Sequence, residues 1–272
     1  MSGVVFGCIA PHPPLLIPDI GRGREQEISA TVKAMQKLAD ELSAAKPDMA
    51  LIVSPHGQWQ YGAMGVFTGT ASRGDMLSWG SRTTEVSLPN DQDFVKCLAN
   101  ECETAAIPLN SLGSGAYALD HGVMVPLHFL LPSLKGLPVV PLTFSALPIS
   151  AHLDFGRVLH KVASALNKRA ALIASGDLSH RLIPGAPAGY DPKGKDFDKH
   201  VVRASAKMDI KSILDMNDEF IERAGECGLR SITILMGALQ GQKVKPEILS
   251  YEGPFGVGYL VASFRVESEQ DG

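Results

Sequence analysis

The sequence has little cysteine, and the cysteines it has are not arranged for cross-links. Only four occur in 272 residues, and Cys8, Cys97, Cys102 and Cys227 form no Cys-x-x-Cys pair. A disulfide framework needs several cysteines in a short secreted chain, and a structural zinc site needs closely spaced pairs. Neither pattern is present, so reduced thiols are expected.

The sequence also has no long hydrophobic run, and its first residues lead us to expect no leader. Its longest apolar stretch, residues 123–131, is interrupted by Pro126 and His128, whereas a helix that crosses a bilayer needs about 20 apolar residues. The first residues carry no basic segment and reach Pro11 before an apolar leader core could form. These absences predict a cytoplasmic protein that does not enter the membrane.

An excess of charge of one sign is missing as well. The formal net charge is -4, which gives no basic surface for nucleic acid or for an anionic membrane. With 45% hydrophobic and 20% charged residues, the composition is that of an ordinary globular protein rather than a disordered chain. No internal repeat or clear linker divides the sequence, so we expect residues 1–272 to form a single domain.

Three apolar runs each end on residues that can carry chemistry. Residues 4–10 lead into Pro-His-Pro-Pro, residues 49–54 into Pro-His-Gly, and residues 170–175 into Gly-Asp-Leu-Ser-His. Short apolar runs that end at Gly or Pro are typical of buried strands. Since ligands of α/β proteins collect beyond the carboxyl ends of strands, the sequence predicts a site at that edge of the sheet.

The remaining periodic segments complete an α/β pattern. Apolar residues at helical or strand spacing predict the following elements: helices at about 28–42, 91–106, 153–166, 195–208, 217–224 and 229–239, and strands at 139–144, 244–251 and 257–266. We therefore expect a central mixed β-sheet flanked by helices, with the active site at the carboxyl edges of its strands.

Eight histidines are present, and their sequence context separates them. Four lie in a short motif that contains Gly or Pro near the end of an apolar run or segment: His12, His56, His121 and His180. His128 is expected on a helix, and three others are expected to be exposed on helices: His152, His160 and His200. Imidazole is the commonest transition-metal ligand, and two imidazoles with one carboxylate and open positions are typical of non-haem Fe(II) oxygenases.

Four motifs together resemble a known family. Pro-His-Pro-Pro near the start, Ser-Pro-His-Gly, Asp-His-Gly in mid-chain and Gly-Asp-Leu-Ser-His occur in the order found in class III extradiol ring-cleavage dioxygenases. The resemblance implies that His12 and His56 bind Fe(II) and that His180 is the catalytic base. It also implies that His121 contacts the substrate hydroxyl or oxygen.

The same resemblance implies a third, acidic metal ligand late in the chain. Glu226 is the first choice, because it precedes a predicted helix as the family's late ligand does. Cys227 is the alternative, because the related Memo proteins have a cysteine in a similar Cys-Gly segment. Glu252 is ranked lower, since an acidic residue before the last strand is also an ordinary turn residue.

Two functions follow as expectations. The first is an Fe(II)-dependent dioxygenase that opens the ring of a catechol-type substrate with O2. The alternative is a Memo-like metal-binding protein with a redox, sensing or interaction role and no ring cleavage. Zn(II), Mn(II) and copper are the alternative metals, and a homodimer or an AMMECR1-type protein is the partner that the resemblance implies.

Overall fold

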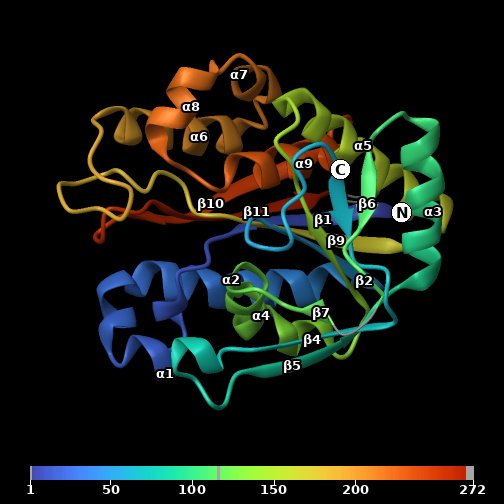
Figure 1. The fold of residues 1–272 in the computed structure, drawn as a ribbon, viewed down its shortest axis with the longest axis horizontal. Helices are drawn as coiled ribbons and strands as arrows, with labels where there is room; N and C mark the ends of the chain where they lie inside the picture. The colour runs from blue at the N-terminus through green and yellow to red at the C-terminus, as the bar shows by residue number, and fades with distance from the viewer. Residues whose placement is uncertain (1, 115–116, 268–272) are drawn as a thin grey trace.

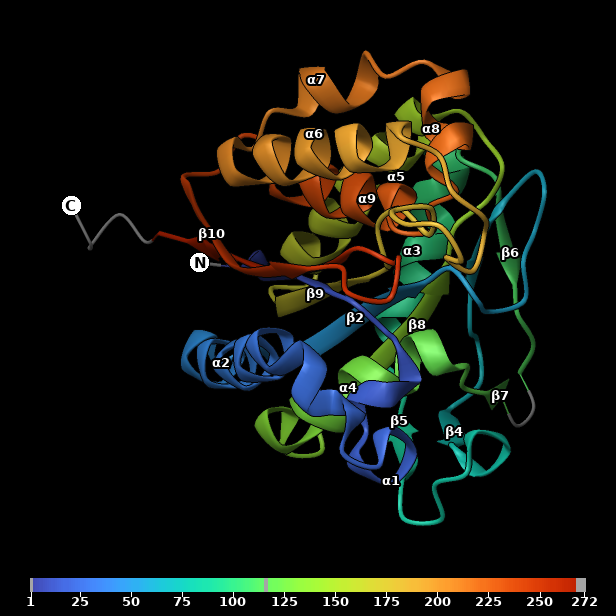
Figure 2. The same ribbon diagram turned by 90° about the vertical axis from the view of Figure 1, so that its left-hand side faces the viewer.

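The computed structural model of the chain describes residues 2–114 and 117–267. Within them, an eight-stranded sheet lies at the centre and helices cover both of its faces (Figures 1 and 2). The strand order is β10 (Val244–Glu252), β11 (Tyr259–Val266), β1 (Gly3–Ala10), β9 (Arg169–Ser175), β2 (Met49–Ser54), β8 (Val139–Thr143), β3 (Met64–Val66) and β6 (Leu109–Ser111).

The four central strands β1, β9, β2 and β8 run parallel. Parallel strands are buried on both faces, so they consist of nearly continuous apolar residues; β1 and β2 are buried along their whole length. Antiparallel pairing of β11 with β1, and of β3 with β8, makes the sheet mixed. The carboxyl ends of β1, β9 and β2 therefore meet at one edge.

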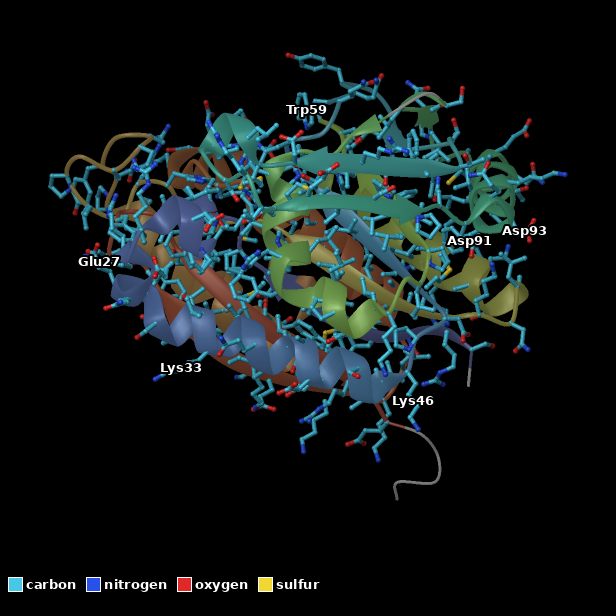
Figure 3. All side chains as sticks on the ribbon, turned by 90° about the horizontal axis from the view of Figure 1, so that it is seen from below. Glu27, Lys33, Lys46, Trp59, Asp91 and Asp93 are labelled. Carbon is cyan, nitrogen blue, oxygen red and sulfur yellow. The ribbon has the colours of Figure 1, made fainter. Side chains whose placement is uncertain are left out.

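Each face of the sheet has its own apolar core. One face is covered by α3 (Gln92–Thr104), α5 (Ile149–Ala165), α6 (Lys193–Lys207), α7 (Ile210–Leu214), α8 (Asp218–Ala224) and α9 (Leu229–Leu239). The other is covered by α1 (Pro18–Gly21), α2 (Ser29–Ala45), α4 (His121–Leu134) and the short turns η1 (Pro14–Leu16) and η2 (Arg24–Ile28). On α2 the apolar side faces the sheet, whereas Lys33 points away from it (Figure 3).

A small three-stranded sheet extends the second face. It has the order β5 (Glu85–Pro89), β4 (Ala71–Asp75) and β7 (Tyr117–Ala118). The link between β4 and β5 contains a 3-10 turn, η3 (Leu77–Trp79), which Figure 1 shows beside α1. This hairpin brings a segment from the middle of the chain to the edge where β1 and β2 end.

Glycine allows α5 and α9 to pack backbone against backbone. A Cβ added to Gly156 would lie 2.0 Å from the carbonyl oxygen of Ile234, and one added to Gly237 would lie 2.1 Å from that of Leu153. Real Cβ atoms do not approach that closely, so these two positions accept no side chain without a shift of the helices. The close packing holds α9, which begins two residues after Cys227, against α5.

The predicted α/β architecture is confirmed, and the strands that end on histidine motifs lie where the sequence placed them. The sequence analysis assigned no element bounds to α4, because Pro126 and Pro132 lie inside it. It was wrong about His152, whose side chain is fully buried with its ring nitrogens against the carbonyl oxygens of Pro148 and Ser145. In the described part of the chain, no helix is both long and apolar enough to cross a membrane.

Candidate metal centre

His12 lies just beyond the end of β1 and is almost completely buried. Its ring nitrogen Nδ1 is 2.9 Å from the hydroxyl oxygen of Ser175, the last residue of the neighbouring strand β9. The backbone N–H of His12 donates to the carboxylate of Asp177 at 2.9 Å. Both contacts come from β9 and its extension, so the parallel pairing of β1 with β9 sets the position of the ring.

The hydroxyl of Ser175 determines which nitrogen of His12 is free. Pro126 has no N–H, so the carbonyl of Gly122, four residues earlier in α4, lacks its helical partner. Ser175 donates its hydroxyl proton to that carbonyl at 2.5 Å. Its oxygen must then accept a proton from Nδ1 of His12, and neutral imidazole carries only one N–H. Nε2 of His12 is left with a lone pair, as a metal ligand requires.

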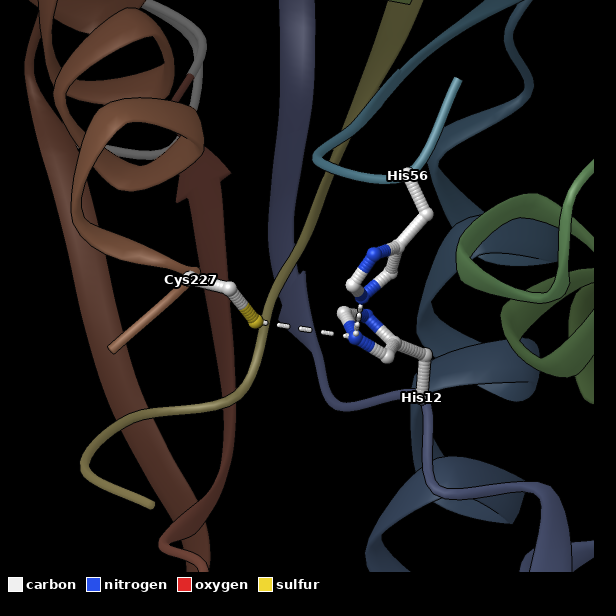
Figure 4. Close-up of side chains that lie close together, drawn as sticks. All are labelled: His12, His56 and Cys227. Atoms are coloured by element: carbon white, nitrogen blue, oxygen red, sulfur yellow. Dashed lines mark hydrogen bonds between the residues drawn. The ribbon is translucent and has the colours of Figure 1, made fainter. Parts of the chain in front are cut away.

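His56 follows β2 and points at the same place (Figure 4). Its backbone N–H donates to the hydroxyl of Ser54 at 3.2 Å, and Ser54 in turn donates to the carboxylate of Asp120 at 2.6 Å. The Nε2 atoms of His56 and His12 are 3.0 Å apart. The two imidazoles that the sequence analysis selected therefore converge, although 44 residues separate them.

Cys227 completes the group from the opposite side (Figure 4). Its sulfur lies 3.6 Å from Nε2 of His12 and accepts the backbone N–H of Asp177 at 3.3 Å. Within the described residues, the ligand atoms of His12, His56 and Cys227 all lie within 4.8 Å of one another. Two imidazole nitrogens and a sulfur at this spacing suit a transition metal that accepts soft and borderline ligands.

Close backbone packing brings Cys227 this near. A Cβ added to Gly176 would lie 2.2 Å from the Cα atom of Gly228, which follows Cys227. The backbone N–H of Cys227 donates to the carbonyl oxygen of Asp177 at 3.3 Å. The segment after β9 and the segment before α9 are thus in direct contact, because both carry glycine at the contact point.

The two acidic candidates lie elsewhere. The side chain of Glu226 is only 4% exposed, but its carboxylate accepts the backbone N–H of Leu229 at 2.6 Å and lies 3.8 Å from the guanidinium of Arg230. It caps the start of α9. Glu252 accepts the backbone N–H and the hydroxyl of Thr31, both at 2.7 Å. The structure therefore brings Cys227, and neither carboxylate, to the histidine pair.

Burial controls the protonation of these groups. It lowers the pKa of His12 well below its ordinary value, with the neighbouring imidazoles acting in the same direction. It raises the pKa of the Cys227 thiol well above its ordinary value, and the carboxylate of Asp177 adds to this rise. The histidine is thus neutral and ready to bind a cation, whereas the thiol must release a proton when it becomes a ligand.

His180 lies at the end of the segment that follows β9. Its Nδ1 atom is 2.5 Å from the carbonyl oxygen of Gly225, in the loop that precedes Cys227. Because a carbonyl can only accept, Nδ1 carries the proton in the neutral ring, and Nε2 keeps a lone pair. His180 is also among the imidazoles whose charge lowers the pKa of His12 and of His56.

A buried carboxylate holds the segment that carries His180. Asp198 of α6 accepts the backbone N–H of Ser179 at 2.8 Å and the hydroxyl of Tyr251 at 2.6 Å. Ser179 donates its hydroxyl proton to the carbonyl of Ala224 at 2.7 Å. Sequence analysis missed Asp198, because nothing local distinguishes an acid on a polar helix.

His121 begins α4 and forms a series of ring contacts. It stacks on His56 with a centroid distance of 4.3 Å and lies 5.4 Å from His12. The centroid of the Trp79 ring lies 5.1 Å from that of His121. The structure thus gathers His12, His56 and His121 in direct ring contact, with His180 nearby. Sequence analysis missed Trp79 and Ser175, since neither belongs to a histidine motif.

Comparison with known proteins decides the family. Residues 7–262 match the family described as the catalytic LigB subunit of aromatic ring-opening dioxygenase. The chain belongs to this LigB family. The resemblance drawn from the histidine motifs is therefore confirmed, and the match covers the segments that supply His12, His56, His121, His180 and Cys227.

Several relatives extend the comparison. The LigB chain is 34% identical over 261 residues to protein CA_C1420 of Clostridium acetobutylicum; this covers 93% of the chain but 56% of that relative, so the chain spans little more than half its length. It is 23% identical to the 2-aminophenol 1,6-dioxygenase beta subunit of a Pseudomonas species, covering 97% of the chain and 94% of the relative.

A further relative and a solved structure complete the picture. The MEMO1 family protein MMP1387 of Methanococcus maripaludis is 27% identical over 177 residues, which is 61% of the chain and 55% of that protein. The crystal structure of the uncharacterized protein JW3007 from Escherichia coli K12 superimposes with a TM-score of 0.66 at 18% identity, covering 95% of the chain and 99% of JW3007. That likeness supports the fold alone.

Proposed function

We propose that this LigB chain is a metal-dependent dioxygenase that opens the ring of a catechol-type substrate beside its diol. One observation carries the proposal: the Nε2 atoms of His12 and His56 converge at 3.0 Å, and the ring of a third histidine, His121, stacks on that of His56. A site that only stored a metal would need the ligands, but it would not need additional imidazoles capable of proton transfer.

The residues present fit a metal ion. His12 and His56 supply neutral imidazole nitrogens, and Cys227 supplies the third donor, with its sulfur 3.6 Å from Nε2 of His12. Three protein ligands leave positions open for reactants. We propose Fe(II) as the ion, which would hold the diol and O2 next to each other so that electrons pass from the ring to O2.

His180 acts as the proton acceptor in this proposal. The carbonyl of Gly225 fixes the proton on Nδ1, so Nε2 is the nitrogen available to a substrate hydroxyl. An imidazole at neutral pH can take this proton when the diol binds and return it to the product. The hydrogen bond from the backbone N–H of Ser179 to the carboxylate of Asp198 holds the neighbouring residue His180 in place while the proton moves.

His121 orients the reactants in this proposal. Its ring stacks on His56, so its nitrogens remain beside the metal ligands. Burial lowers its pKa, which keeps the imidazole neutral and able to hydrogen-bond a hydroxyl or an oxygen.

The substrate class rests on the relatives. Their names include a 2-aminophenol 1,6-dioxygenase beta subunit and 2,3-dihydroxyphenylpropionate/2,3-dihydroxicinnamic acid 1,2-dioxygenases, the latter for example from Mycolicibacterium gilvum. These names describe aromatic rings with two neighbouring heteroatoms. We propose that this chain acts on the same kind of ring, with the adjacent oxygens or an oxygen and a nitrogen facing the metal.

A second function is favoured by Cys227. A thiolate in place of a carboxylate suits softer ions such as copper and zinc, and one relative is a MEMO1 family protein. A Memo-like metal-binding protein with a redox, sensing or interaction role would use the same His12, His56 and Cys227 group. It would have no ring-cleaving turnover.

One experiment separates the two functions. The protein is purified without oxygen, its metal content is measured, and oxygen uptake is followed with catechol, 2-aminophenol and 2,3-dihydroxyphenylpropionate. Iron-dependent uptake with a yellow ring-opened product, absent from His12→Ala, supports the dioxygenase. Tight binding of copper or zinc without uptake for any of the three compounds would refute it in favour of the Memo-like function.

A further inference from the structure

Trp79 is an exposed tryptophan beside the candidate metal centre. It ends the turn η3 between β4 and β5, and 46% of its surface is exposed. Leu77 on the same turn is also exposed, whereas Met76 just before it is buried. The turn thus anchors itself through Met76, and Trp79 is the exposed side chain of the turn whose ring contacts a histidine of the site among the described residues.

The turn is fixed to the body of the protein. Asp19 of α1 accepts the hydroxyl of Ser81 at 3.0 Å and that of Thr83, both just after the turn. Ser81 also hydrogen-bonds the hydroxyl of Thr84 at 3.0 Å. Hydrogen bonds from Ser81 and Thr83 hold the pKa of Asp19 below its ordinary value, so it stays charged as their acceptor. The segment that carries Trp79 is therefore fixed to α1.

Trp79 is the outermost ring of a series that starts at a metal-ligand candidate. His56 stacks on His121 at 4.3 Å with 24° between the ring planes, and the Trp79 ring lies 5.1 Å from that of His121, tilted by 50°. A tilted contact leaves much of an indole face uncovered, in agreement with its exposure. The exposed indole therefore adjoins a histidine that itself contacts a metal-ligand candidate.

The second tryptophan of the chain provides a contrast. Trp59 lies in the loop after His56, is 43% exposed and contacts the ring of Tyr61 at 5.0 Å (Figure 3). Its recorded ring contact within the described residues is with Tyr61 rather than with a histidine of the site. The two tryptophans thus have similar exposure but different neighbours, so one can serve as the control for the other.

We propose that Trp79 is a substrate-binding residue: its indole forms the outer wall of the site and packs against the aromatic ring of the bound diol. This rests on the proposed function and extends it to a residue outside the histidine motifs. Aromatic rings attract one another in offset or edge-to-face arrangements, beyond the burial of their surface. An aliphatic side chain in this place offers burial alone.

The test measures binding of catechol to the Fe(II)-loaded protein without oxygen, by calorimetry. Trp79→Ala is expected to raise the Kd by roughly three- to tenfold, the range of one aromatic pair, and Trp79→Phe is expected to restore most of the affinity. Leu77→Ala, on the same turn, and Trp59→Ala are the matched controls and should bind catechol as the wild type does. Iron content should be equal in all variants.

Tryptophan emission gives an independent readout. Since the chain has two tryptophans, Trp59→Phe leaves the emission of Trp79 alone, and catechol should quench it with the calorimetric Kd. In Trp79→Phe, the emission of Trp59 should fall only to the extent that catechol absorbs the light. Equal quenching in both variants, an unchanged Kd in Trp79→Ala, or loss of iron from Trp79→Ala would overturn the role of Trp79.

The outcome also distinguishes this inference from the proposed function. Catechol binding that is unaffected by Trp79→Ala removes only Trp79 from the site and leaves the dioxygenase in place. Failure of the Fe(II)-loaded wild type to bind any of catechol, 2-aminophenol and 2,3-dihydroxyphenylpropionate in the calorimeter would overturn both.

Discussion

The hydroxyl of Ser175 lies 2.9 Å from Nδ1 of His12 and, by donating its own proton to the carbonyl of Gly122, holds the ring in the tautomer with a free Nε2. This relationship links a proline in α4, which leaves that carbonyl without a helical partner, to the ligand atom of a histidine after β1. The candidate metal centre is thus arranged by Ser175 and Pro126, which are not among its candidate ligands.

Removing that hydroxyl should weaken the metal centre. Ser175→Ala is expected to reduce metal affinity by about 10- to 100-fold, the usual effect of losing a partner that orients a ligand imidazole. Isothermal titration with Fe(II) or Zn(II) measures it. Ser263→Ala is the control, because Ser263 is also fully buried in the sheet but its hydroxyl has no partner among the described residues. Equal affinities of both variants would contradict the role of Ser175.

Cys227 and Glu226 should respond differently to substitution. Cys227→Ser is expected to lower metal affinity by more than about a hundredfold, since loss of a ligand costs more than loss of an orienting partner. Glu226→Gln should retain its metal, because a glutamine oxygen can still accept the N–H of Leu229. Metal analysis after dialysis against a weak chelator compares the two; the reverse pattern would restore Glu226 as the ligand.

His180 should matter for turnover but not for the metal. His180→Phe removes the proton acceptor while filling a similar volume, so oxygen uptake with the active catechol is expected to fall by about 10²- to 10⁴-fold. Metal content and thermal unfolding should match those of the wild type. His128→Phe, on the exposed side of α4, is the control. Full oxygen uptake by His180→Phe would exclude it as the base.

Asp198 should make stability depend on pH. Burial raises its pKa from 3.8 to about 7, so the folded state binds this proton more tightly than the unfolded state. Its contribution to stability is complete below about pH 4 and is lost as the pH rises to about 7, by at most about 1.4 kcal/mol per pH unit.

Urea unfolding at pH 5 and pH 7 measures this contribution. Asp198→Asn keeps an oxygen for the N–H of Ser179 and cannot ionise, so its stability should fall less between the two pH values than that of the wild type. Asp196→Asn, an exposed carboxylate two residues earlier on α6, should behave as the wild type does. The same pH slope in both variants would show that Asp198 does not titrate in this window.

Periodicity was sufficient to predict most of the fold. The apolar runs that form β1, β2 and β9, and the helical spacing in α2, α5 and α9, lie where the sequence analysis placed them within a few residues. Local pattern reports these elements because each buries one face or both. It did not report the bounds of α4, whose two prolines oppose a helix, or the burial of His152, which depends on loop 145–148 folding over it.

The candidate site was only partly contained in the motifs. His12 and His56 could be selected because strands of a parallel sheet end at a common edge, which is a general property of the architecture. The choice between Glu226 and Cys227 could not be made in the same way. The side chains of adjacent residues point in different directions, and no sequence pattern indicates which of these two side chains points toward β1.

The sequence by itself determined most of the helices and strands, because apolar spacing is a local property of the chain. The order of its motifs was enough to indicate the family and to select His12 and His56. Only the tertiary structure decided the rest. Contact between Gly176 and Gly228 brings Cys227 to His12, Pro126 and Ser175 together fix a tautomer, and a distant hairpin places Trp79 against His121. Each of these contacts joins segments that are far apart in the chain. Packing sets the distance between such segments, and a local sequence pattern does not contain it.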